Sequence, residues 1–202
     1  YYEMANHAVV RMEPGSTFKT ISLMAALDDG KVKMKDTIRV EHDGWWYHGA
    51  KHMDAHPSDT VYTIRQAMAV SSNIALAKIV TDGYNGSAKK FVKKLRNMGL
   101  CDSVDFTIPG ANQALINVPN DTVTISKLAY GHSVELSPLQ ILMFYNGIAN
   151  DGKMISPLFV KEIRKDGKTI EEFESTVIKG SMCDDSTLEG VRECLHDVVW
   201  DN

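Results

Sequence analysis

A serine and a lysine, Ser16 and Lys19, stand three positions apart at the predicted start of a helix. Side chains at this spacing share one helical face, with Cβ atoms about 5–6 Å apart. A serine hydroxyl needs a neighbouring base to act as a nucleophile, and a lysine amine can be that base where burial lowers its pKa. Ser16 could instead serve only as a helix cap. The Pro14-Gly15 turn before it can display the hydroxyl in a cleft, which favours a nucleophilic serine over a simple cap.

A second polar group, Ser71-Ser72-Asn73, lies between two predicted helical runs. On such a short break a hydroxyl can relay a proton, and an amide can bind a peptide-like substrate. The alternative is that Ser71 or Ser72 only caps the helix that follows. Ser71 and Asn73 are therefore candidate site residues, with the capping role left open between the two serines.

Together these two elements resemble the motifs of penicillin-binding transpeptidases and serine β-lactamases. The longer string Glu-Pro-Gly-Ser-Thr-Phe-Lys, at 13–19, is similar to that of class B (monofunctional) penicillin-binding proteins, and within that class to the septal, cell-division type. The resemblance continues over 54–57, 63–76 and 130–140, so it spans nearly the whole chain.

The resemblance implies a role for each site residue. Ser16 would be the acylated nucleophile and Lys19 its general base, with the Ser16 backbone N–H in the oxyanion hole. Ser71 would relay a proton toward the leaving amine, and Asn73 would hold the substrate peptide. The reaction would attack the D-Ala-D-Ala bond of a peptidoglycan stem peptide and pass the acyl group to a neighbouring strand's amine. β-Lactam antibiotics would acylate the same serine, and no metal or organic cofactor is implied.

The fold implied is the helical portion of the α/β fold of these enzymes. It would be mainly α, with short β-hairpins and with the central five-stranded sheet largely missing. Residues 1–202 would then be a partial transpeptidase domain, truncated at both ends. The family's Lys-Thr/Ser-Gly motif is absent, because Lys168-Thr169 is followed by Ile170. We therefore expect little or no transpeptidase activity from this chain alone.

The resemblance also implies a cellular setting. The intact parent would be anchored in the inner membrane by one N-terminal helix, with this domain on the periplasmic or extracytoplasmic side. Division-complex proteins would be its partners. A β-lactam-sensing receptor domain and a serine β-lactamase remain alternatives, because both use Ser-x-x-Lys. No deacylating base is visible in the sequence, which favours transpeptidation.

Other clusters have simpler interpretations. His48, His52 and His56 recur every four residues, a spacing that binds zinc on a helix, but Gly49 and Pro57 argue against a regular helix. The lysines of 89–94 form a basic helical face, for which solvation is a better explanation than nucleic-acid binding.

The composition is that of a soluble globular protein: 44% hydrophobic and 24% charged over 202 residues, with a formal net charge of −4. This charge disfavours a nucleic-acid partner. No apolar run approaches the roughly 20 residues needed to cross a bilayer. The three cysteines, Cys101, Cys183 and Cys194, lack a CxxC spacing, and a bridge between the last two stays open.

Helical patterns dominate the chain. Cap and breaker residues predict helices over 16–27, 63–70, 74–80, 87–98, 122–130, 137–150 and 186–200. Thr63 with Gln66, and Ser186 with Glu189, fit the capping-box pattern. Residues 31–62 and 101–121 are expected to be irregular, and 157–173 is expected to form a hairpin around Asp166-Gly167.

Overall fold

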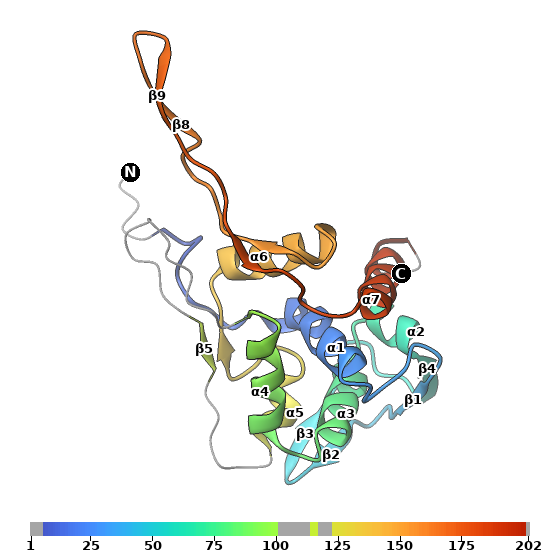
Figure 1. Cartoon of the computed structure of the whole chain (residues 1–202). Coiled ribbons are helices and arrows are strands. Elements are labelled where there is room, and N and C mark those ends of the chain that lie inside the picture. The colour runs from blue at the N-terminus through green and yellow to red at the C-terminus, as the bar shows by residue number, and fades with distance from the viewer. Residues whose placement is uncertain (1–5, 101–113, 117–122, 201–202) are drawn as a thin grey trace.

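The computed structural model describes residues 6–100, 114–116 and 123–200 (Figure 1). Its helices are the 3-10 turn η1 (Gly15–Thr17) and the α-helices α1 (Phe18–Asp28), α2 (Ile64–Ala69), α3 (Asn73–Gly83), α4 (Ala88–Asn97), α5 (Thr124–Leu128), α6 (Pro138–Ala149) and α7 (Asp185–Trp200). Its strands are β1 (Thr37–Val40), β2 (Trp45–Tyr47), β3 (Ala50–His52), β4 (Thr60–Thr63), β5 (Leu115–Ile116), β6 (Val134–Glu135), β7 (Met154–Ile155), β8 (Glu162–Lys165), β9 (Lys168–Glu172) and β10 (Val177–Lys179). The expected helix-rich fold is confirmed.

Most helices begin at the predicted caps. Thr63 and Gln66 form the complete capping box of α2. Ser87 accepts a hydrogen bond from the Lys90 N–H at the start of α4. Ser137 caps α6, which has proline in its first turn, where a missing N–H costs nothing. These local interactions explain why the helix positions follow so closely from the sequence.

The capping box predicted for Ser186 and Glu189 is wrong. Helix α7 begins at Asp185, and the carboxylate of Asp184 accepts a hydrogen bond from the Thr187 N–H at 2.6 Å. The Ser186 hydroxyl donates to the same carboxylate at 3.0 Å. A carboxylate gains more than a hydroxyl from the positive end of the helix, so Asp184 takes the cap.

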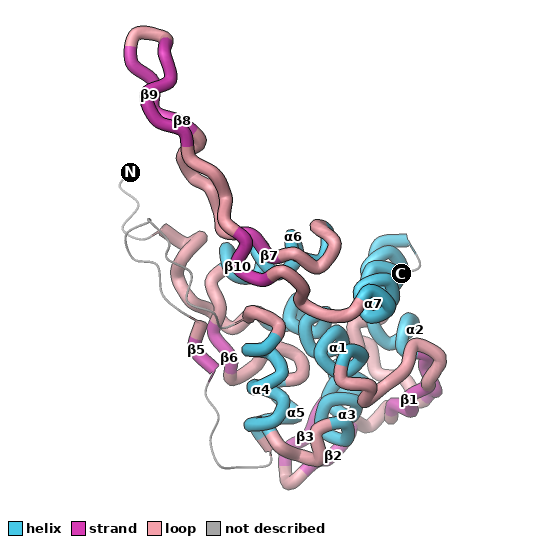
Figure 2. Tube along the Cα trace, in the orientation of Figure 1, coloured by secondary structure: helices cyan, strands magenta, loops and turns pink. Residues whose placement is uncertain are grey.

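The strands in the described ranges pair only as two-stranded antiparallel sheets, shown in magenta in Figure 2. Two of these pairs, β1 with β4 and β2 with β3, lie within 31–62, where irregular chain was expected. The β2–β3 turn places His48 at φ 45° and Gly49 at φ 84°, the backbone of a tight hairpin turn. Strands β2 and β3 have three residues each, too few to show an alternating pattern, and β1 and β4 pair across a long intervening segment that local patterns do not show. Most of the expected loop 101–121 lies outside the described residues.

The hairpin expected around Asp166-Gly167 is confirmed as β8 and β9. Both turn residues have positive φ, 51° and 77°. The hairpin and its flanking segments project far from the helical body (Figure 1). Their base is closed where the Ser156 N–H donates to the Thr176 carbonyl at 2.8 Å.

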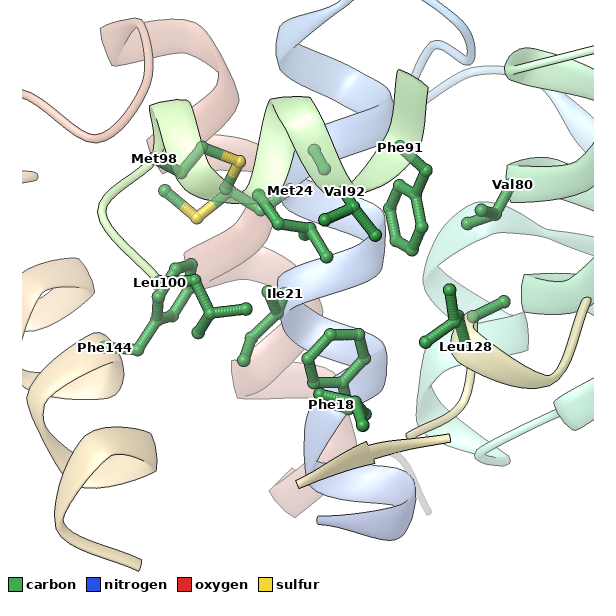
Figure 3. Packing of buried hydrophobic residues seen from close by; sticks show 14 of the residues in the cluster. Phe18, Ile21, Met24, Val80, Phe91, Val92, Met98, Leu100, Leu128 and Phe144 are labelled. Carbon is green, nitrogen blue, oxygen red and sulfur yellow. The ribbon is translucent and has the colours of Figure 1, made fainter. Parts of the chain in front are cut away.

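Helix α1 lies at the centre of the packing. Nine of its eleven residues are buried, and it packs against α3 and α7. Phe18, Ile21 and Met24 enter the larger hydrophobic cluster, shared with α4, α5 and α6 (Figure 3). Leu23 enters a second cluster, shared with α2 and α3. A helix held on all sides in this way is a rigid support for anything at its N-terminus.

The cysteines that can be placed are not bridged. Cys183 is half-buried and Cys194 is buried, and both are free thiols. Burial raises the pKa of each thiol to about 12, which keeps them protonated and unreactive. Cys101 lies outside the described residues.

Candidate active site

Ser16 lies on the 3-10 turn η1, at the entrance to α1. Helix α1 begins at Phe18 with Thr17 in the N-cap position, so the capping role considered for Ser16 is wrong. Gly15 has φ 56°, a left-handed conformation that glycine adopts at little cost, and it turns the chain sharply into the helix. The Thr17 hydroxyl donates to the Pro14 carbonyl at 2.8 Å and closes this turn. Ser16 itself is exposed, and no hydrogen bond to its hydroxyl comes from the described part of the chain. Its exposure makes the side chain accessible to a ligand.

The chain before Ser16 is fastened to the segment that follows α5. Glu13 accepts hydrogen bonds from the Ser133 N–H and pairs with the His132 ring, both at 2.8 Å. These bonds hold the pKa of the Glu13 carboxyl below its usual value. Met12 exchanges backbone hydrogen bonds with Leu136, each 3.0 Å long. The chain that leads into the serine turn is thus held by residues more than 100 positions away.

Lys19 occupies the first turn of α1 and is 2% exposed. Its Nζ donates to the Ser71 Oγ at 2.9 Å and to the Ser71 carbonyl at 2.5 Å. Burial lowers the pKa of the Lys19 amine from 10.5 to about 8, while the charge of Asp54 acts in the opposite direction. An amine with this pKa is neutral often enough near pH 8 to accept a proton.

Ser71 ends helix α2 in an uncommon backbone conformation, with φ 53°. Its N–H bonds the Met68 carbonyl at 3.0 Å, and the next N–H, of Ser72, bonds the Ala67 carbonyl at 2.9 Å. These two bonds form the Schellman motif that ends many helices, usually with glycine in the left-handed position. A serine there brings a hydroxyl to the Lys19 amine at the expense of some backbone strain.

The two residues that follow Ser71, Ser72 and Asn73, make different contacts. Ser72 is the cap of α3, because its hydroxyl accepts from the Ala75 N–H at 3.0 Å. This answers the question left open between the two serines: Ser72 caps, and Ser71 is left to contact Lys19. The Asn73 amide donates to the Met53 carbonyl at 2.8 Å, which fixes the side chain at the edge of the cleft.

All four predicted site residues line one cleft of about 410 Å³. Its lining consists of Ser16, Lys19, Ala55, His56, Tyr62, Ala69, Val70, Ser71 and Asn73. A larger cavity of about 560 Å³ lies along α7, but its lining lacks any serine or cysteine nucleophile. Chemistry rather than size therefore identifies the site. A hydroxyl, a buried amine, a second hydroxyl and an amide around one cleft can support acyl transfer through a serine ester.

The three histidines do not form a metal cluster. His48 lies in the β2–β3 turn, His52 is buried with its Nδ1 at 2.7 Å from the Tyr130 hydroxyl, and His56 lines the cleft. Among the described residues, no group of three histidine, cysteine or acidic side chains is placed to hold a metal ion.

Sequence reasoning missed the residues that support the site. Asp54 is hydrogen-bonded to Ser72 and Ile74. Glu13 is hydrogen-bonded to the His132 ring and to the Ser133 N–H. The backbone of Gly131 lies against that of Gly15. Each partner lies 18 or more residues away along the chain, so no local spacing identifies these contacts.

Comparison with known proteins agrees with the geometry. The family model described as the penicillin-binding protein transpeptidase domain matches residues 2–202, and the chain belongs to this family. Penicillin-binding protein PbpB of Mycolicibacterium smegmatis is 27% identical over 184 residues, covering 84% of this chain and 26% of that protein. The probable peptidoglycan D,D-transpeptidase FtsI of Caulobacter vibrioides is 24% identical over 162 residues, covering 78% of this chain and 27% of that protein. The chain is thus a homologue of peptidoglycan D,D-transpeptidases and spans about a quarter of the length of these relatives.

Solved structures show the same fold. The transpeptidase domain of Burkholderia pseudomallei penicillin-binding protein 3 superimposes with a TM-score of 0.79 at 21% identity, covering 96% of this chain and 55% of that one. A peptidoglycan glycosyltransferase from Burkholderia ambifaria gives the same TM-score at 22% identity, covering 58% of its chain. No helix in the described ranges is long and apolar enough to span a membrane.

Proposed function

We propose that the protein carrying this chain is a peptidoglycan D,D-transpeptidase that works through an acyl-enzyme at Ser16. The observation that carries this proposal is the contact between Lys19 Nζ and Ser71 Oγ, 2.9 Å long, in a cleft that Ser16 also lines. This contact brings the proposed base, Lys19, and the proposed proton relay, Ser71, together in the cleft that the exposed Ser16 also lines.

In the acylation step, the neutral Lys19 amine takes the proton of Ser16 Oγ as the oxygen attacks the carbonyl of the penultimate D-Ala. The Ser16 backbone N–H stabilises the negative charge on the carbonyl oxygen. The C–N bond then breaks, and a proton passes from Lys19 through Ser71 to the departing D-Ala amine. Asn73 holds the peptide backbone of the substrate.

In the second step, the amine of a neighbouring stem peptide attacks the Ser16 ester. Its proton returns along the same route, a new amide bond forms, and Ser16 is regenerated. A β-lactam enters at the first step, but its leaving nitrogen stays tethered in the opened ring. The serine therefore stays blocked.

The cleft favours transpeptidation over β-lactam hydrolysis. Among the described residues that line it there is no carboxylate to activate a water molecule against the ester. A non-catalytic β-lactam sensor is consistent with the same lining, so activity on stem peptides has to separate these two.

The setting of the reaction is part of the proposal. The similarity to proteins named PbpB and FtsI supports a septal, class B enzyme that acts in cell division. We propose that the parent is anchored in the inner membrane with this domain on the extracytoplasmic side, and that it assembles with division-complex proteins. Residues 1–202 would be one part of its transpeptidase domain.

The experiment is a donor–acceptor assay on the full-length protein. A stem peptide ending in D-Ala-D-Ala and an acceptor amine should yield free D-Ala and cross-linked peptide, and Ser16→Ala should abolish both. The matched control is Ser175→Ala, which changes an exposed serine in the segment between β9 and β10 and should leave the rate unchanged. Rapid nitrocefin turnover would indicate a β-lactamase instead, and acylation without peptide turnover would indicate a sensor.

A further inference from the structure

Asp54 lies behind the 71–73 turn, between β3 and β4, and is hydrogen-bonded to Ser72 and Ile74. We propose that Asp54 is a positioning residue of this site: its carboxylate holds the Ser71–Asn73 turn in the conformation that presents Ser71 Oγ to the Lys19 amine. This inference rests on the proposed acyl-serine function, because it concerns the same site.

Both carboxylate oxygens of Asp54 are used. Oδ2 accepts from the Ser72 hydroxyl at 2.7 Å, and Oδ1 accepts from the Ile74 N–H at 2.9 Å. The carbonyl of the preceding residue, Met53, accepts a hydrogen bond from the Asn73 side-chain amide at 2.8 Å. Residues 53 and 54 therefore bind three consecutive residues, Ser72 to Ile74, which directly follow Ser71, each through a different group.

The turn needs such external support. Ser71 has φ 53°, a conformation that a non-glycine residue keeps only where its surroundings hold it. Lys19 holds one side of the turn through its two bonds to Ser71. Asp54 holds the other side, since the Ser72 hydroxyl that it orients is also the cap of α3.

The charge of Asp54 also acts on Lys19. It raises the pKa of the amine against the stronger lowering effect of burial. The other titratable side chains that line the cleft are His56 and Tyr62, and neither contributes to the shift of Lys19. Asp54 thus acts on both members of the Lys19–Ser71 pair, on one through hydrogen bonds and on the other through charge.

A residue that only stabilised α3 would behave differently. Loss of a helix cap lowers stability but leaves a distant amine unchanged. The matched control is Ser87→Ala, which removes the cap of α4 outside the cleft. The control should lower the unfolding midpoint without altering the Lys19 titration or the acylation rate.

The test uses two substitutions at Asp54. Asp54→Ala removes both acceptors and the charge, whereas Asp54→Asn keeps an acceptor for the Ile74 N–H and a polar group facing Ser72. We expect Asp54→Ala to slow acylation of the full-length protein by fluorescent penicillin at least about tenfold, since small misplacements of catalytic groups have effects of this size. Asp54→Asn should recover most of that loss.

Lys19 is followed separately, by NMR titration of its side-chain carbon in the 202-residue chain. Both substitutions should lower the Lys19 pKa below the value of the unsubstituted chain. The contradicting outcome is a folded Asp54→Ala that keeps both the Lys19 pKa and the acylation rate of the unsubstituted protein. In that case the positioning role is wrong and the proposed function stands. If the unsubstituted full-length protein is never acylated, the proposed function fails, and the positioning role of Asp54 in acylation fails with it. Should Asp54→Ala not fold, Ser72→Ala replaces it, because it removes the hydroxyl through which Asp54 holds the turn. Slower acylation than in Ser87→Ala then supports the positioning role, and an equal rate overturns it.

Discussion

The Lys19 amine determines how the site responds to pH. It is buried against the end of α2, and its hydrogen bonds within the described part of the chain both go to Ser71. The fall of its pKa from 10.5 to about 8 corresponds to about 3 kcal/mol. The folded state binds this proton less tightly than the unfolded chain, so the stability lost below pH 8 returns as the pH rises toward 10.5. The lowered pKa of Lys19 thus costs stability at neutral pH, which the proposed role of this amine as a base would explain.

We predict that the acylation rate of Ser16 rises with pH. Only the neutral amine can accept the serine proton, so the rate should increase about tenfold per unit below pH 8 and level off above it. Second-order rates with a fluorescent penicillin between pH 6 and 9.5 provide the measurement. A rate that is flat or falls across this range would show that Lys19 is not the base.

At the residue scale, the sequence indicates the candidate site residues more readily than their supports. Ser16 and Lys19 are three positions apart and Ser71 follows a predicted helix end, so spacing made them candidates, and the family resemblance supplied their expected roles. The left-handed conformation of Ser71 and the contacts of Asp54 arise from tertiary packing, which local patterns do not encode.

At the scale of elements, the turn that carries Ser16 depends on a close approach of two backbones. Gly131 follows α5 with φ 87°, and its carbonyl accepts from the Gly15 N–H at 3.3 Å. A Cβ at Gly131 would overlap the Gly15 carbonyl oxygen. The nucleophile turn and the end of α5 can therefore lie together only with glycine at this position.

Gly131→Ala should displace the Ser16 turn and reduce acylation by at least about tenfold. Gly49→Ala is the matched control, because Gly49 has φ 84° but open space around its Cβ position. Both variants carry the backbone strain, and only Gly131→Ala adds the clash. Comparison of acylation rates and thermal midpoints separates the two effects. Equal acylation rates in the two variants would exclude a role for the contact.

At this scale, elements fixed by interactions between residues close in sequence were predicted, and a strand pair fixed by a long-range contact was missed. Helices α2, α4 and α6 begin at side-chain caps three residues from their partners, and all three were predicted. The hairpin around Asp166-Gly167 was predicted from its turn residues. The β1–β4 pair was missed, because its register joins Thr37 to Thr63 across a long intervening segment.

At the scale of the whole molecule, α1 connects the reactive site to the packing. Its N-terminus carries Ser16 and Lys19, and its body is buried in two hydrophobic clusters. The projecting hairpin lies outside this arrangement, with Ile163 and Ile170 exposed (Figure 1). The described strands provide no sheet wider than two strands, in keeping with the expected loss of the family's central sheet.

The most direct test of the account is to map the site of acylation. The full-length protein is treated with penicillin, digested, and analysed by mass spectrometry, in parallel with Lys19→Ala. The account predicts one adduct, on the peptide that contains Ser16, and none in Lys19→Ala. An adduct on another residue, or one retained at the same rate without Lys19, would contradict the assignment of Ser16 as nucleophile and Lys19 as its base.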